Sequence, residues 1–332
     1  MEILGSTFDD SVFSEVRDRV SVPLSSYNAK LCEPEWFCES TALDTDDPLE
    51  TQKVYKFRGD LAVRQGKYQK ALDAYSSCLE WIADNNLTIR RDVLEGMARC
   101  CTRLGQRDRA LDLAELLSKE ASNTCHLTSL LLLKISIYQH FGFLGSKMSS
   151  LQQLCSLLPF NPWHWNSLGQ TCLQLLERDT TAGLCWPQRC KSADEQKQNH
   201  TQTEQQQEEA AELDKNHIWL KACTCFIRTR LLLRILRQQQ SSFVLQRSEN
   251  TLQSSDEALQ QLGPKESTLQ ALTEVMSEDL IPDKMREDYQ DGESLLSVCV
   301  QSFRERWWNK ILQTGVLKTD CSSCQTQTDT KS

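Results

Sequence analysis

The amino-acid sequence predicts an all-α protein: a short α-solenoid of helical hairpins, with capping helices towards the C-terminus and a disordered insertion. Three observations support this fold class. The 332 residues include only 12 Gly and 8 Pro, too few to punctuate many short strands, while 39% are hydrophobic. A pattern of small residues and turn glycines recurs along the first half of the chain. One long tract is too polar to form a core.

The first helical hairpin is predicted around Gly59 and Gly66. Gly59 is small, as is required where two helices cross closely, and Gly66 can adopt the conformation of a tight turn between them. Tyr68, Ala71 and Tyr75 follow at positions i, i+3 and i+7, a spacing that places them on one buried face of the second helix. The pattern therefore predicts two antiparallel helices joined by a short turn.

Further units repeat this order of small residue, turn and small residue. The second has its turn at Gly105, and the third has Lys147 at the helix crossing where alanine is expected. The fourth opens with Trp165, Leu168 and Gly169. These units resemble tetratricopeptide repeats, which are helix–turn–helix units of about 34 residues. The resemblance implies a short superhelical array whose first helices line a concave surface, and it implies no catalytic residue.

A polar insertion interrupts the fourth unit. Residues 179–213 are rich in Gln, Glu and Lys and are too polar to build a core, so they are predicted to be disordered. Beyond them, Trp219, Ala222 and Phe226 repeat the spacing of the buried face in the first unit. The second helix of the fourth unit is therefore predicted to resume after the insertion and to run to about Arg237.

Two more helices are predicted towards the C-terminus. A connector with a short helix is expected over residues 238–264, and helices are expected over 267–280 and 293–312. These two helices are predicted to cap the open end of the array, because an end unit needs a polar outer face. The predicted domains are an N-terminal extended segment (1–50), the repeats (51–178), the insertion (179–213), the completed fourth repeat with capping helices (214–312) and a disordered tail (313–332).

Charge and composition limit the partners and the compartment that we expect. The 37 Lys and Arg residues against 46 Asp and Glu residues give a net charge of −9, which argues against nucleic acid as a partner. The first residues lack the basic start and apolar stretch of a secretory signal, and no apolar run approaches the about 20 residues that cross a bilayer. We therefore expect no membrane association and a reducing compartment, the cytoplasm, the nucleus or both. There the 15 cysteines are expected to be free thiols.

No arrangement of residues in the sequence points to catalysis. The five histidines form no metal-binding or acid–base pattern, and the motifs of nucleophilic and phosphate chemistry are absent. Cys321 and Cys324 have the spacing of half a zinc site, but no second pair lies near them, so a chance pair in the tail is the expected interpretation. The sequence thus predicts a protein that is not an enzyme and that uses no cofactor or metal ion.

The predicted partner-binding groove follows from the tetratricopeptide resemblance. The first helices would present a concave surface to a peptide or a partner helix, and basic positions there would favour an acidic segment. Some members of the family hold a terminal carboxylate with Lys and Asn, but Asp60 stands where the Asn is expected, so that ligand is doubtful. For Trp163, burial against the N-terminal segment is the alternative. The groove residues are Lys53, Lys56, Arg64, Arg99, Arg103, Trp163 and Asn166.

An alternative site lies on the predicted helix that ends near Arg237. Arg230, Arg234 and Arg237 fall within one narrow stripe, at about 100° per residue, opposite the leucines of that helix. A solvated charged face is the simpler interpretation. As a functional site, the stripe would bind an acidic partner or the acidic insertion, or it would serve a nuclear factor associated with nucleic acid. The sequence leaves these alternatives open.

Overall fold

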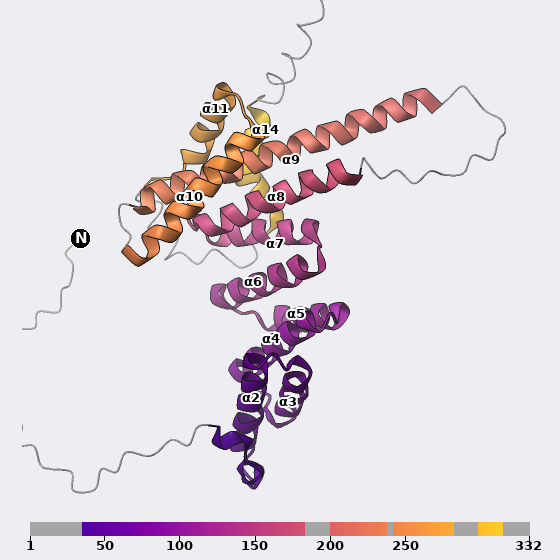
Figure 1. Ribbon diagram of the computed structural model, residues 1–332, viewed down its shortest axis with the longest axis vertical. Coiled ribbons are helices and arrows are strands. Elements are labelled where there is room, and N and C mark those ends of the chain that lie inside the picture. Colours follow the sequence, from indigo (N-terminus) through magenta and orange to yellow (C-terminus); the bar gives the residue numbers. More distant parts are fainter. Residues whose placement is uncertain (1–34, 183–199, 238–241, 282–297, 315–332) are drawn as a thin grey trace, which may run out of the picture.

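The computed structural model describes residues 35–182, 200–237, 242–281 and 298–314 (Figure 1). Every regular element within these ranges is a helix, as the sequence predicts. In chain order the elements are η1 (Trp36–Cys38), η2 (Ser40–Leu43), α2 (Pro48–Arg64), α3 (Tyr68–Trp81), α4 (Leu87–Arg103), α5 (Arg107–Glu120), α6 (Thr124–Phe141), α7 (Leu144–Leu157), α8 (Pro162–Ala182), α9 (His200–Arg237), α10 (Ser242–Leu262), α11 (Glu266–Ser277), α13 (Val300–Phe303), η3 (Arg304–Trp308) and α14 (Asn309–Gln313). The last three elements are continuous and are called the C-terminal helix below.

Consecutive helices pack against one another along the chain. The pairs α2–α3, α4–α5, α6–α7 and α8–α9 form hairpins, and neighbouring pairs meet through α3–α4, α5–α6 and α7–α8. Figure 1 shows the stack rising from α2 and α3 at one end to α10, α11 and α14 at the other. This arrangement is an all-α, solenoid-like fold and confirms the predicted fold class. That its units are tetratricopeptide repeats stays a prediction.

The core is divided between two hydrophobic clusters. Helices α2 to α6 build the first, which contains Leu72, Leu94 and Ile137. Helices α7 to α11 and the C-terminal helix build the second, which contains Trp165 and Phe226. Among the described residues, no helix combines the length and the hydrophobicity that a membrane span requires.

Glycines end the first helix of each of the first three pairs. Gly66, Gly105 and Gly142 have φ angles of 72°, 73° and 74°, a left-handed conformation that side chains disfavour. The turn after each first helix is therefore short. The C-terminal ends of α2, α4 and α6 consequently lie beside the N-terminal ends of α3, α5 and α7, and the turns predicted at Gly66 and Gly105 are confirmed.

Two other glycines lie where helices approach closely. A Cβ atom on Gly59 of α2 would lie 2.5 Å from Cε1 of Tyr75 on α3, and one on Gly169 of α8 would lie 3.0 Å from the ring of Phe226 on α9. The same contact between a glycine and an aromatic ring thus recurs in the first and fourth pairs. Tyr75 is buried, whereas Tyr68, also predicted to face the core, is only half-buried.

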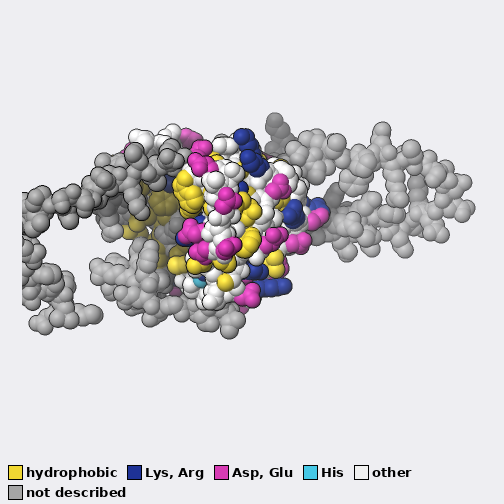
Figure 2. All heavy atoms as spheres, turned by 90° about the horizontal axis from the view of Figure 1, so that it is seen from below, with side chains coloured by type: hydrophobic (Ala, Val, Ile, Leu, Met, Phe, Trp, Pro, Cys, Tyr) yellow, Lys and Arg dark blue, Asp and Glu magenta, His cyan; other side chains and the backbone are white. Residues whose placement is uncertain are grey.

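The segment before α2 lies over that helix. Arg58 of α2 donates hydrogen bonds to the carbonyl oxygens of Phe37 at 2.6 Å and Glu39 at 2.9 Å, and the rings of Phe37 and Phe57 lie 5.5 Å apart. Figure 2 shows this end of the molecule, where hydrophobic, acidic and basic side chains are interspersed. Residues 1–34 of the predicted N-terminal segment lie outside the described residues.

The helices extend further into the predicted insertion than expected. Helix α8 continues to Ala182 and helix α9 begins at His200, so both overlap the segment 179–213 for which disorder is predicted. Gln, Glu and Ala favour helices even where a segment has too few apolar residues to build a core, which accounts for the overlap. Residues 183–199 lie outside the described residues, and α9 ends at Arg237, the predicted end of that helix.

Helix α10 is longer than the short helix predicted in the connector. It has 21 residues and packs against α9. Ser248 and Ser255 are buried on it, at positions where a hydrophobic residue would be expected. The hydroxyl of Ser255 donates a hydrogen bond to the carbonyl oxygen of Thr251 at 2.8 Å, so the burial leaves this polar group satisfied. Because serine is polar, the two buried serines interrupt the apolar periodicity by which the full length of the helix could be predicted from the sequence.

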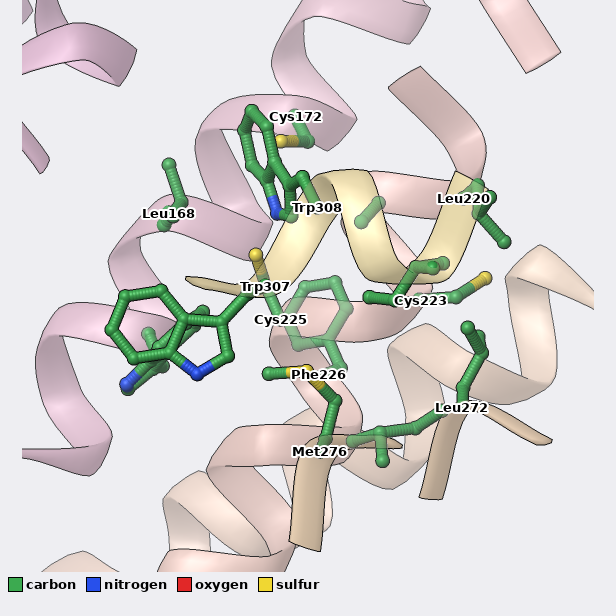
Figure 3. Packing of buried hydrophobic residues seen from close by; sticks show 14 of the residues in the cluster. Leu168, Cys172, Leu220, Cys223, Cys225, Phe226, Leu272, Met276, Trp307 and Trp308 are labelled. Carbon is green, nitrogen blue, oxygen red and sulfur yellow. The ribbon is translucent and has the colours of Figure 1, made fainter. Parts of the chain in front are cut away.

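The C-terminal helix reaches back along the stack, which differs from the predicted cap at the open end. Its first part, α13, packs against α7, and α14 contacts α11. Within η3, a π-helical turn, Trp307 and Trp308 are both buried, and the ring of Trp307 lies 5.0 Å from that of Trp165 on α8. Figure 3 shows both tryptophans among side chains of α8 and α9. The aromatic side chains therefore place this helix on the side of the stack, and residues 293–297 of the prediction lie outside the described residues.

A buried ionic network connects the C-terminal elements. Arg228 of α9 is fully buried and donates hydrogen bonds to both carboxylate oxygens of Asp279, which follows α11, and to the carbonyl oxygen of Met276 at 2.6 Å. Arg306 of the C-terminal helix also contacts Asp279, at 3.4 Å. Burial lowers the pKa of Arg228, and the neighbouring Asp279 opposes that shift.

Gly59→Ala should destabilise the protein, because the added methyl group would collide with the ring of Tyr75. We expect the free energy of unfolding to fall by about 1–3 kcal/mol in urea denaturation. Gly145→Ala is the control, since Gly145 lies in α7 with open space around its Cβ position, and it should be neutral or slightly stabilising. Equal stabilities of the two variants would contradict the close packing of Gly59 against Tyr75.

Asp279→Ala should cost more stability than Arg228→Met. The first substitution leaves a buried guanidinium without its carboxylate, which costs about 3–5 kcal/mol, whereas the second leaves Asp279 partly exposed and still beside Arg306. Glu278→Ala removes an exposed ion pair with Lys310 and should cost less than about 1 kcal/mol. Thermal unfolding that ranks Asp279→Ala with Glu278→Ala would show that the buried network contributes little.

Candidate functional site

A hollow of about 390 Å³ opens where the first three helix pairs meet. It lies at the C-terminal ends of α2, α4 and α6 and at the start of α3, and we call it the basic hollow. None of the residues that line it is Asp or Glu, although the chain has a net charge of −9. Its polar side chains are those of Tyr68, Arg99, Thr102, Arg103, Ser136, Gln139 and His140.

Two of the predicted groove residues, Arg99 and Arg103, lie one turn apart on α4 and both line the basic hollow. Arg99 is held by Glu95, to which its Nη2 and Nε atoms donate hydrogen bonds at 2.6 and 3.0 Å. Arg103 is exposed in the last turn of α4, and within the part of the chain that the structure describes it forms no ion pair. One guanidinium is thus partly neutralised and the other is not.

The three predicted groove residues on α2 do not line the hollow. Lys53 and Lys56 each form an ion pair within α2, the latter with Asp60 at 3.0 Å. Arg64 is exposed in the last turn, next to Val63, which does line the hollow. The charges of the two lysines are therefore balanced locally, and Arg64 lies at the edge of the site.

Asp60 has a structural partner in the core. The hydroxyl of Tyr75 donates a hydrogen bond to its Oδ1 atom at 2.7 Å. Burial, followed by this hydrogen bond, raises the pKa of Tyr75 well above its ordinary value. The carboxylate of Asp60 is therefore bound to both Lys56 and Tyr75.

The remaining predicted groove residues, Trp163 and Asn166, lie elsewhere, on α8. Asn166 lines a second hollow of about 480 Å³, most of whose wall comes from α10. Trp163 is half-buried, with the guanidinium of Arg247 on α10 lying 5.1 Å from the centre of its ring. Helix α10 therefore contacts Trp163, and the structure does not bring the predicted groove residues together into one site.

The alternative arginine stripe on α9 faces α10. Arg230 lies 3.6 Å from a carboxylate oxygen of Asp256, and Arg237 lies 3.2 Å from one of Glu249. Arg234, the third member of the stripe, is exposed. Acidic residues of α10 thus neutralise two of the three arginines. The stripe is therefore neither a fully solvated face nor a free face for a partner.

Helix α6 contributes the site residues that the sequence analysis missed. Ser136, Gln139 and His140 line the basic hollow, but the strong apolar pattern of α6 marks it in the sequence as a core helix. Gln139 accepts a hydrogen bond from the ammonium group of Lys147 on α7, a residue that the sequence marks because alanine is expected there. Gln139 and His140 lie just before the turn at Gly142, and this position in the sequence could have placed them at the end of α6 where the hollow lies.

The cysteines that the structure describes are free thiols. Burial raises the pKa of Cys78 and of Cys100 to about 11, so these thiols stay protonated near neutral pH and are poor nucleophiles. Over the described ranges, no group of three or more His, Cys, Asp or Glu side chains is arranged to hold a metal ion. Cys321 and Cys324 lie outside these ranges.

Comparison with known proteins gives one family and close relatives in mammals. Residues 2–198 and 182–314 match the family of unknown function DUF5588. The human "Uncharacterized protein C8orf76" is 36% identical over 358 aligned positions, which cover 93% of each chain. The rat "Uncharacterized protein C8orf76 homolog" is 34% identical over 351 positions, again covering 93% of each chain. The chain therefore belongs to the family DUF5588.

Proposed function

We propose that this protein is a non-catalytic binding scaffold whose basic hollow receives an acidic segment of a protein partner. The observation that carries the proposal is the charge of the hollow. Arg99, Arg103 and His140 line it, whereas no acidic residue does, in a chain whose net charge is −9. An acidic partner is repelled by the chain as a whole and attracted at this place, so charge complementarity selects both the partner and its position.

The wall of the basic hollow, which is formed by buried residues, supports a binding role. Cys100 and Leu133 line it and are buried in the first hydrophobic cluster, so its wall is part of the core. A site that is formed before binding loses little conformational freedom when a ligand enters. The contact with Glu95 positions Arg99, while the exposed Arg103 remains available to a partner.

We infer that the protein works in a reducing compartment, the cytoplasm or the nucleus. The free cysteines support this inference, because several of them are buried packing residues of a kind that persists as thiols where glutathione and thioredoxin act. Neither a cofactor nor a metal ion has a part in the proposed function.

The second candidate, a factor that binds nucleic acid through the stripe of Arg230, Arg234 and Arg237, has weaker support. Binding to phosphate groups needs several free cations, because affinity grows with the number of counterions released. Here α10 pairs with Arg230 and Arg237, so the stripe would have to lose both contacts first.

Reversing the charge of the basic hollow should abolish partner binding without unfolding the protein. In the double variant Arg99→Glu, Arg103→Glu we expect an unchanged melting temperature, since exposed charges contribute about 0–1 kcal/mol to stability. Affinity purification from cells should recover fewer partners with this variant than with the unmodified protein. The control Arg109→Glu, Lys119→Glu makes the same change in charge at exposed positions of α5 and should keep the partners.

Nuclease treatment in the same purification separates the two candidates. Recovery that survives nuclease and depends on Arg99 and Arg103 supports the scaffold. Recovery that nuclease removes, and that Arg234→Glu reduces, would favour the nucleic-acid factor. If the hollow variant keeps its melting temperature and all its partners at low salt, the basic hollow is not the binding site.

A further inference from the structure

Lys147 is a buried cation with no acidic partner in the part of the chain that the structure describes. It lies in the first turn of α7, it is only 7% exposed, and its Nζ atom donates a hydrogen bond to Oε1 of Gln139. Burial lowers its pKa, and no neighbouring carboxylate opposes that shift. An unpaired charge in such a place calls for a physical explanation.

The fold itself gives Lys147 no advantage. A buried ammonium group loses its hydration, and a cation in the first turn of a helix lies beside the positive end of the helix dipole. Ala71 in α3 and Ala110 in α5 occupy the same position, fourth in the helix, and both are fully buried. Alanine therefore satisfies the packing at this crossing, and the lysine of the third pair must serve something else.

Gln139 connects this cation to the basic hollow. Because its Oε1 atom accepts the hydrogen bond from Lys147, its amide NH₂ group remains to donate. Gln139 also lines the hollow. The positive charge of Lys147 thus lies directly behind a hydrogen-bond donor of the site, and a ligand in the hollow would be the first anion to balance it.

The basic hollow offers more donors than a carboxylate can accept. Arg99 and Arg103 carry guanidinium groups one turn apart, Tyr68 and Ser136 carry hydroxyl groups, and His140 carries a ring nitrogen. A carboxylate has two oxygens and one charge, whereas a phosphate monoester has three terminal oxygens and a charge of about −1.5 to −2. Guanidinium groups match the geometry of phosphate oxygens. The donors and the buried cation together fit a phosphate better than a carboxylate.

The helix dipoles around the hollow neither strongly favour nor strongly disfavour the binding of a phosphate. The negative ends of the dipoles of α2, α4 and α6 favour basic residues in their last turns, which accounts for Arg64, Arg103 and His140. The positive ends of α3 and α7 lie beside them at the hairpin turns, so the dipoles offset one another. The helix dipoles do not account for Lys147, because it lies near the N-terminal end of α7.

We propose that the basic hollow binds a phosphorylated serine or threonine side chain within the acidic segment of the partner. Arg99 and Arg103 contact the phosphate oxygens, and Lys147 acts through Gln139 as a positioning residue whose charge the ligand balances. This inference rests on the proposed function and names the chemical group that the hollow recognises.

The test measures the binding of fluorescein-labelled peptides to the full chain by fluorescence anisotropy. Three peptides share a background of alternating alanine and glutamate and differ only at the central residue, which is phosphoserine, glutamate or serine. We expect the phosphoserine peptide to bind at least about tenfold more tightly than the glutamate peptide at physiological ionic strength. Inorganic phosphate should displace it only at a much higher concentration than the unlabelled phosphoserine peptide does.

Two variants and a control assign the residues. Lys147→Met should reduce the ratio of phosphoserine to glutamate affinity, a readout that a purely structural role would not change. Arg103→Gln alters an exposed residue and should weaken phosphoserine binding by about tenfold even if the Lys147 variant fails to fold. Lys134→Met, on α6 and paired with Glu115 at 3.9 Å, should leave the binding unchanged.

The outcomes separate this inference from the proposed function. Equal affinities for the phosphoserine and glutamate peptides, both lost in Arg103→Gln, would overturn the phosphate preference and leave an acidic-segment scaffold. Binding of none of the three peptides would overturn both proposals. Displacement by inorganic phosphate at the concentration of the competing peptide would make free phosphate the ligand. An unchanged affinity ratio in a folded Lys147→Met protein would remove Lys147 from the site.

Discussion

The buried guanidinium of Arg228 is the group on which the C-terminal half of the molecule depends. A charge without exposure has to be balanced where it lies, and Asp279 can balance it only if the chain after α11 returns to α9. Arg306 joins the same carboxylate from the C-terminal helix, and the rings of Phe160 and Trp165 lie 5.6 and 5.7 Å from the guanidinium carbon. The contacts of Asp279 therefore connect α9, the end of α11 and the C-terminal helix, and the ring of Trp165 adds α8 to this group.

The N-terminal half depends on a steric constraint instead. The ring of Tyr75 fits between α2 and α4 because Gly59 and Gly96 leave room for it, with their Cβ positions only 2.5 and 2.9 Å from its carbon atoms. Left-handed glycines keep the connections of the hairpins short, so the C-terminal ends of α2, α4 and α6 meet around one hollow. The packing that stabilises the stack is thus also what brings Arg99, Arg103 and His140 together.

The chain contains two groups of basic residues, and they differ in whether acidic residues of the chain pair with them. On α9, acidic residues of α10 balance Arg230 and Arg237, and the stripe becomes part of the contact between two helices. Around the basic hollow, α4 supplies one carboxylate for Arg99, and nothing within the described ranges balances Arg103 or Lys147. A buried cation without a carboxylate costs stability unless a ligand balances it, and for this reason the hollow, and not the stripe, is the proposed binding site.

The sequence by itself determined most of the helices, the turns at Gly66 and Gly105 and the close crossing at Gly59, because these features follow from backbone preferences and from a period within one helix. It also marked Arg99 and Arg103 as residues of one surface, since both lie on one face of α4. Only the tertiary structure decided that α10 contacts Trp163, that the arginine stripe is largely balanced and that α6 completes the basic hollow. Whether a charge finds a partner depends on residues far apart in the chain that folding brings together, and neither composition nor helical period encodes those contacts.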